Sequence, residues 1–234
     1  MEDADPTRSK ILLSLSALGT ILNLADAARS AGARRAAGLF ALGVGLPAVG
    51  EVLATGPLNL LRHRTRPRVA GVPGAVLLGW YCAIRGSQAV ARRALARMPL
   101  GETARRRTLP AAAALVGTSL DLVLDPAGLD AGLWEWKGDG AYARGIRGAN
   151  GRRGVPLVNY LGWLLLVAGA VSAYERAFGG EGGEGQDDRL AALLLLPPYL
   201  AAAAWAARTS RPRYLLYSAP FPAALVLAMR PSGR

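Results

Sequence analysis

The longest uncharged stretches of this chain constrain its fold more than any other feature. Residues 154–174 and 190–207 contain no Asp, Glu, Lys or Arg, and residues 36–61 contain only Glu51. A helix of roughly 20 mostly apolar residues is long enough to cross the hydrocarbon core of a bilayer. Several such runs in a chain of 234 residues predict an integral membrane protein rather than a soluble fold with buried helices.

The apolar runs divide the chain into about seven predicted helices, with arginines at their ends. The fold class is therefore an all-α, polytopic transmembrane helical bundle, and residues 1–234 are treated as a single integral membrane domain, expected in a bacterial cell membrane. The predicted helices cover residues 10–28, 36–55, 70–91, 108–125, 155–177, 189–208 and 213–230.

The charge and the rare residue types exclude several kinds of function. The net charge is +12, but the arginines flank apolar runs as loop charges of membrane proteins do. We therefore expect membrane lipids with anionic head groups as partners, and no nucleic acid. Cys82 and His63 are the only cysteine and histidine, which argues against a disulfide framework, a metal centre and a Ser-His-Asp triad. No metal and no cofactor are expected.

An internal repeat relates two of the predicted helix starts. The sequence GVPGAVLLGW at residues 71–80 and the sequence GVPLVNYLGW at residues 154–163 are identical at six of ten positions. Each copy opens a helix with a proline near its start, where a missing N–H costs nothing. The repeat unit is a helix pair, with halves at about residues 36–91 and 108–177. An even number of spans separates the copies, so they run parallel, related by an axis along the membrane normal.

This topology places acidic residues together. The second and fourth predicted helices end on the side where the third and fifth begin, so Glu51, Asp121, Asp125 and Asn159 are expected near one membrane face. Tryptophans of the two repeat copies are expected about 10 Å or more deeper, at roughly 1.5 Å per residue. Carboxyl groups within apolar helices are costly and indicate a functional site. The alternative interpretation is that Asp125 ends its helix beside a proline and that Glu51 is an interfacial charge.

The chemistry predicted for these acids is proton donation. Burial in a medium of low dielectric constant favours the neutral carboxylic acid, and Asp121 and Asp125 lie on one helix face at positions i and i+4. Such an acid can protonate an electron-rich alkene, and tryptophan rings can stabilise the resulting cation. An aromatic belt at the membrane interface is the alternative for Trp134 and Trp136. The candidate substrate-binding residues are Asn159, Tyr160, Trp80, Trp163, Trp134 and Trp136.

Three segments resemble the signature of the carotenoid biosynthesis protein family: DLVLDP at 121–126, GLWEW at 132–136 and GVPLVNYLGW at 154–163. Glu51, the Gly56-Pro57 pair, the GVP sequence at 71–73 and Trp80 resemble the first half of that signature. The resemblance covers about residues 45–170. It implies a cofactor-independent membrane hydratase that adds water across a terminal double bond of a carotenoid or related isoprenoid. The acidic positions of the family correspond here to Glu51, Asp121 and Asp125, with Asn159 as a polar partner.

The chain departs from the family pattern after Gly56-Pro57, where LNLLRHR at residues 58–64 replaces an expected aromatic segment. The stretch between Trp136 and Gly154 is also rich in arginine and glycine. Because both departures lie on the face with the acids, they bear on the identity of the substrate. Three functions remain open: the hydratase, a cyclase in which an internal double bond captures the cation instead of water, and a non-catalytic lipid-binding or scaffold protein.

Overall fold

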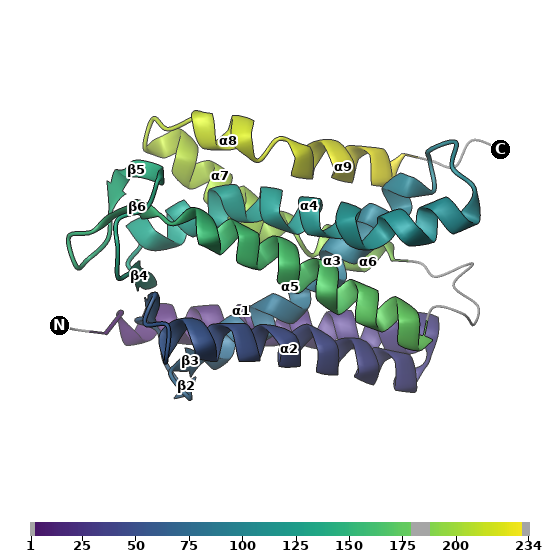
Figure 1. The fold of residues 1–234 in the computed structure, drawn as a ribbon, viewed down its shortest axis with the longest axis horizontal. Helices are drawn as coiled ribbons and strands as arrows, with labels where there is room; N and C mark the ends of the chain where they lie inside the picture. The colour runs from purple at the N-terminus through teal and green to yellow at the C-terminus, as the bar shows by residue number, and fades with distance from the viewer. Residues whose placement is uncertain (1–2, 179–187, 231–234) are drawn as a thin grey trace.

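The computed structural model describes residues 3–178 and 188–230, which form a bundle of helices running back and forth along one direction (Figure 1). The predicted all-α helical bundle is confirmed, and helices occupy all seven predicted segments in the predicted order. The first five are α1 (Pro6–Ala31), α2 (Ala33–Thr55), α3 (Gly74–Leu95), α4 (Glu102–Asp130) and α5 (Leu157–Phe178).

The last two predicted helices are each divided in two. The first comprises α6 (Arg189–Leu193) and α7 (Leu196–Arg208), and the second comprises α8 (Arg213–Tyr217) and α9 (Pro220–Met229). Prolines stand in the first turn of α7 and of α9. A proline cannot donate a backbone hydrogen bond to the preceding turn, so each one starts a new helix instead of continuing the previous one.

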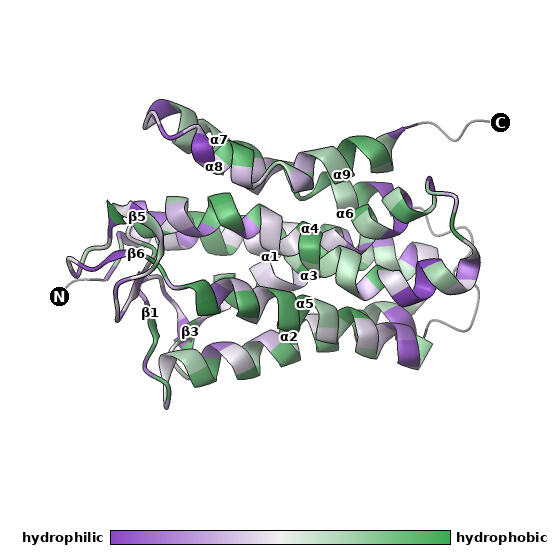
Figure 2. Ribbon diagram, turned by 45° about the horizontal axis from the view of Figure 1, so that its top comes forward, coloured by the Kyte–Doolittle hydropathy of each residue, from purple (hydrophilic) through white to green (hydrophobic). Residues whose placement is uncertain are grey.

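Within the described residues, five stretches are long and apolar enough to cross a membrane: α1, α2, α4, α5 and Arg189–Arg208. Hydrophilic residues gather toward the two ends of the bundle (Figure 2). Large apolar side chains on the outer faces are exposed, including Leu15, Ile21, Val49 and Leu165. Lipid tails would cover such faces, because a bilayer needs an apolar outer surface of this kind.

The helix α3 lies inside the bundle, where it packs against α1, α2, α4 and α9. It is not among the stretches apolar enough to span a membrane by composition, because it contains buried polar residues. Arg85 is 1% exposed and Gln88 is fully buried. Protein neighbours rather than lipid surround this helix, so it tolerates polar groups that a lipid-facing helix would not.

Short strands occupy one end of the bundle (Figure 1). They form three antiparallel pairs. The predicted long connection after Asp125 is therefore ordered around strands. The pairs are β1 (Leu61–His63) with β4 (Trp134–Trp136), β2 (Arg68–Val69) with β3 (Val72–Pro73), and β5 (Tyr142–Arg147) with β6 (Arg153–Val155).

The two copies of the repeated sequence enter their helices in the same way. Gly71 has φ of +83° and Gly154 has φ of +73°, a conformation that favours glycine over residues with a side chain. A short strand follows or contains each glycine, and Pro73 and Pro156 directly precede α3 and α5. The helices thus begin a few residues later than predicted. As predicted, α2 and α4 end where α3 and α5 begin, at the strand end of the bundle (Figure 1).

Candidate functional site

Two buried carboxyl groups of α4 share one amide of α5. Asp121 is 4% exposed and Asp125 is 3% exposed. The side-chain nitrogen Nδ2 of Asn159 donates a hydrogen bond to Oδ2 of each aspartate, both at 2.8 Å. An amide nitrogen carries two hydrogens, so a single Asn159 can serve both carboxyl groups. The i and i+4 spacing that placed the aspartates on one face therefore brings them to a common partner.

The helix α4 continues past Asp125 to Asp130, so the interpretation of Asp125 as a helix-end residue is wrong. The following residue, Pro126, has no N–H to donate to the carbonyl of Leu122. That carbonyl accepts a hydrogen bond from the hydroxyl of Tyr142 at 2.7 Å instead. Burial raises the pKa of Tyr142 above its ordinary value, and the nearby Tyr214 and Tyr217 raise it further. Tyr142 therefore remains a protonated donor at neutral pH.

Trp134 of β4 reaches back to the aspartate pair. Its indole Nε1 donates a short hydrogen bond to Oδ1 of Asp125. The ring lies against Gly128 of α4, where a Cβ atom would collide with it. The absence of a side chain at residue 128 therefore lets Trp134 approach Asp125, and both oxygens of Asp125 accept hydrogen bonds.

Glu51 of α2 is the centre of a second polar group. Its Oε1 accepts a hydrogen bond from Nε1 of Trp80 at 2.8 Å, and its Oε2 lies 2.8 Å from Nε2 of His63. The expectation that Trp80 lies about 10 Å deeper than Glu51 is wrong. Glu51 lies one turn before the end of α2, and the long indole side chain of Trp80 bridges the remaining distance.

The tryptophans that end the two repeat copies contact each other. The ring centroids of Trp80 and Trp163 lie 4.1 Å apart with an interplanar angle of 31°. Trp80 therefore joins the Glu51 group to α5, the helix that also contributes Asn159 to the aspartate pair.

The ladder between β1 and β4 connects the two polar groups. His63, which contacts Glu51, pairs directly with Trp134, which contacts Asp125. The predicted placement of all three acids toward one end of the bundle therefore corresponds to their arrangement here, in two groups joined by one strand pair.

Tyr160 and Trp136 lie inward beside the aspartates rather than in an interfacial belt. Trp136 is 5% exposed and Tyr160 is 7% exposed. Both belong to one buried cluster that also contains Val123 of α4. Because Trp134 also turns inward to Asp125, the aromatic-belt interpretation does not describe these two tryptophans.

His63 is the site residue that sequence reasoning missed. It is 4% exposed and contacts Glu51, although the sequence shows only a lone histidine among arginines. The one available signal was its position shortly after the acid-bearing helix. Within residues 3–178 and 188–230, no three His, Cys, Asp or Glu side chains are grouped so as to hold a metal ion.

Residues 11–228 match the family model described as "Carotenoid biosynthesis protein". Comparisons with the curated proteins and with the solved structures give no match. The matched region contains α2 to α5 and every residue of the two polar groups.

Proposed function

Because the chain belongs to the carotenoid biosynthesis protein family, we propose that it catalyses the acid-dependent hydration of a terminal double bond of a carotenoid or related isoprenoid. The observation that carries the proposal is the pair of buried carboxyl groups, Asp121 and Asp125, that share Asn159. An apolar substrate would reach this pair from the membrane, which we expect to be a bacterial cell membrane.

The proposal assigns the proton donor to Asp121. Two close buried carboxyl groups do not readily ionise together, so the pair retains one proton. Hydrogen bonds donated to a carboxylate stabilise its charged form. Asp125 accepts them at both oxygens, from Trp134 and Asn159. This arrangement supports a charged Asp125 that orients the amide, beside a neutral Asp121 that gives its proton away.

The reaction conserves atoms and needs no redox partner. The proton of Asp121 forms a C–H bond with the less substituted carbon of the terminal double bond, which leaves a tertiary carbocation. The oxygen of a water molecule then forms a C–O bond with this cation. The protonated alcohol returns one proton to the Asp121 carboxylate, which restores the acid. The sum is an alkene plus water giving a tertiary alcohol.

Aromatic rings supply the environment for the cation. A cation over an indole face is attracted to it, by about 2 kcal/mol or more when desolvated. The paired rings of Trp80 and Trp163 and the ring of Trp134 are the candidates. Trp80 is anchored by its hydrogen bond to Glu51, so its face is held in one orientation.

The Glu51 group supports water as the species that captures the cation. Glu51 and His63 form a polar pair 2.8 Å apart, connected through β1 and β4 to the aspartates. A carboxylate and an imidazole are both able to orient a water molecule. A cyclase would use the same proton donor but would need a dry cavity in which an internal double bond reaches the cation first.

Expression in a lycopene-producing host, followed by mass analysis of the pigments, tests the proposal. A product heavier than the substrate by one water supports hydration, whereas an isomer of unchanged mass indicates cyclisation. In deuterated water the product should carry one solvent-derived deuterium on carbon. A confirmed substrate that is converted without such incorporation would overturn the mechanism. Unchanged pigments with well-folded protein would favour a non-catalytic lipid-binding or scaffold role.

A further inference from the structure

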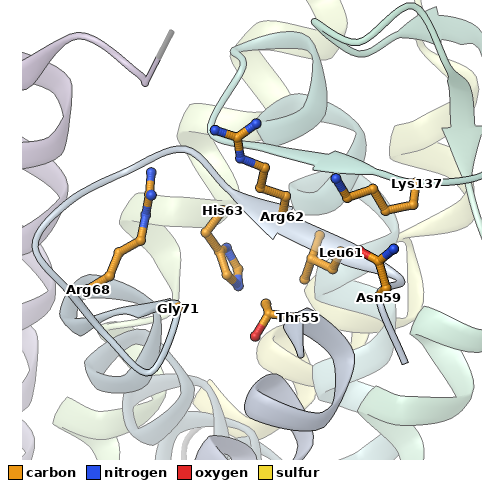
Figure 3. A pocket seen from close by; sticks show the side chains of 8 residues that line it. All are labelled: Thr55, Asn59, Leu61, Arg62, His63, Arg68, Gly71 and Lys137. Carbon is orange, nitrogen blue, oxygen red and sulfur yellow. The ribbon is translucent and has the colours of Figure 1, made fainter. Parts of the chain in front are cut away.

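A cavity of about 190 Å³ opens at the strand end of the bundle, beside the Glu51 group (Figure 3). A single buried water needs only about 10–15 Å³ of such space, so the cavity has room for a larger polar group. Figure 3 shows His63 and Thr55 near its middle, with Arg68 on one side and Lys137 on the other. Its lining comprises Thr55, Asn59, Leu61, Arg62, His63, Arg68, Gly71 and Lys137.

The charge of the lining is positive. Arg62, Arg68 and Lys137 contribute cationic groups, and none of the described lining residues is acidic. Two of these cations already have carboxylate partners: Glu135 lies 3.6 Å from Arg62, and Asp3 lies 2.5 Å from Arg68. Lys137 is exposed at the opening and follows β4 directly. Among the described residues Lys137 has no carboxylate partner, so it leaves one uncompensated cation at the cavity, which favours an anionic occupant.

A buried atom of His63 provides independent evidence for an occupant. His63 is 4% exposed, and its Nδ1 has no hydrogen-bond partner among the described residues. Its other ring nitrogen lies 2.8 Å from Glu51. Buried polar atoms in proteins nearly always have a partner, so an unpaired one calls for a ligand or water. Because Nε2 of His63 contacts Glu51, Nδ1 is the ring nitrogen left to bind an occupant of the cavity.

We propose that this cavity binds a phosphate group. Arginine, lysine and imidazolium groups together with hydroxyl and amide side chains make up a typical phosphate-binding set. The segment LNLLRHR at residues 58–64, which departs from the family pattern, contributes Asn59, Leu61, Arg62 and His63 to the lining. The phosphate group belongs either to the head group of an anionic phospholipid or to a soluble phosphate compound. This binding does not depend on the hydratase proposal.

The test uses the full-length protein, purified in detergent and also in lipid nanodiscs. Inorganic phosphate and glycerol 3-phosphate are titrated while the unfolding temperature is followed, with chloride at matched ionic strength as reference. In parallel, native mass spectrometry counts the phosphatidylglycerol molecules retained from a mixture with phosphatidylcholine. A saturable rise in unfolding temperature with the soluble phosphates indicates a soluble ligand. Selective retention of phosphatidylglycerol without that rise indicates a lipid head group.

The decisive variants each remove one positive charge, either at the cavity or, as a control, at the other end of the bundle. Lys137→Gln removes an exposed cation at the cavity, and Arg107→Gln removes an exposed cation on α4 at the other end of the bundle. Binding should weaken at least tenfold in Lys137→Gln and less than twofold in Arg107→Gln, and Lys137→Arg should retain it. Both substitutions are at the surface and leave the core intact. Equal effects of the two neutral variants, or no binding to wild-type protein in either arm, would overturn the proposal.

Discussion

The rings of Trp80 and Trp163 lie 4.1 Å apart, and these residues end the two copies of the repeated sequence. Equivalent residues of two parallel repeats lie at equal depth, and they meet only if they lie next to the axis that relates the repeats. We predict that the axis relating the two copies passes between α3 and α5, where these rings meet. The Glu51 group and the aspartate pair lie on either side of it, each with an acid from the preceding helix.

Replacing Asp121 with asparagine should abolish most product formation. A positioned general acid contributes roughly 10²–10⁴-fold to rate, and asparagine has no acidic proton. Asp125→Asn should also lose activity, because it replaces the carboxyl group that accepts hydrogen bonds from Trp134 and Asn159. The measurement is product formed per folded protein, with Glu102→Gln on the exposed end of α4 as the control. Full turnover in Asp121→Asn would remove this residue from the mechanism.

Two tryptophan substitutions separate ring contact from hydrogen bonding. Trp80→Phe retains an aromatic ring but deletes the N–H that Glu51 accepts, whereas Trp163→Phe changes the ring at the other side of the same pair. Loss of a hydrogen bond to a charged group costs about 1.5–3 kcal/mol. Trp80→Phe should therefore lower the rate and thermal stability more than Trp163→Phe does. Equal effects on both quantities would mean that the bond to Glu51 contributes little.

A methyl group added at residue 128 should disturb the contact between Trp134 and Asp125. The ring of Trp134 occupies the space that a Cβ atom of Gly128 would need. Gly128→Ala should therefore displace Trp134, weaken its bond to Asp125 and change the tryptophan fluorescence together with the rate. Gly138→Ala is the matched control, because nothing lies within 4 Å of the Cβ position at Gly138. Unchanged fluorescence and activity in Gly128→Ala would contradict the expected displacement.

A buried ion pair far from the site should dominate the stability of the bundle. Asp188 is fully buried and lies 2.5 Å from Arg85, and it also contacts Arg92 at 2.6 Å. Removing one partner of such a pair costs roughly 3–5 kcal/mol because a buried charge is left uncompensated. Asp188→Asn should therefore lower the unfolding temperature in detergent markedly. Glu102→Gln, which breaks an exposed pair with Arg106, should cost about 0.5 kcal/mol or less. Similar shifts for both variants would refute this ranking.

The N-terminal segment should lose its attachment only in acid. Hydrogen bonds from Arg68 and then from Arg66 lower the pKa of Asp3 below its ordinary value of 3.8. Because the pKa of Asp3 is lowered in the folded protein, its contacts with Arg68 and Arg66 stabilise the attached N-terminal segment above pH 3.8. This stabilisation is lost as the pH falls through the lowered pKa. The amide of Ala4, which donates to the carbonyl of Arg64 at 2.9 Å, should show equal protection factors at pH 5 and pH 7. Loss of protection between these values would contradict the assignment.

Hydropathy was sufficient to predict the helices, but not where two of them break or continue. The run 190–207 reads as one apolar helix, yet Pro197 and Pro198 inside it divide it at the start of α7, because a missing N–H acts locally whatever the hydropathy is. In contrast, Pro126 leaves α4 unbroken, since the hydroxyl of Tyr142 serves the carbonyl that the proline frees. That partner comes from a strand 20 residues away in sequence, so no local pattern predicts it.

One part of the candidate site could be predicted from the sequence and another part could not. The i and i+4 spacing of Asp121 and Asp125 is a property of one helix, and it was readable from the sequence. The contact between His63 and Glu51 depends on β1 turning back over the end of α2, and β1 is fixed by pairing with β4. The register of that pairing joins segments about 70 residues apart, which residue spacing within one segment cannot specify.

The ladder between β1 and β4 has the form of an interface in a homodimer. Equivalent strands of two identical subunits pair antiparallel about a twofold axis, as β1 after α2 pairs with β4 after α4. The two sites are arranged alike, because each has an acid near the end of one helix and a ring on the strand that follows that helix. The two sites differ in their other members, since one has Glu51 with His63 and the other has an aspartate pair. The proposed hydration needs one group that donates a proton and another that orients water, and these two unlike sites offer one of each.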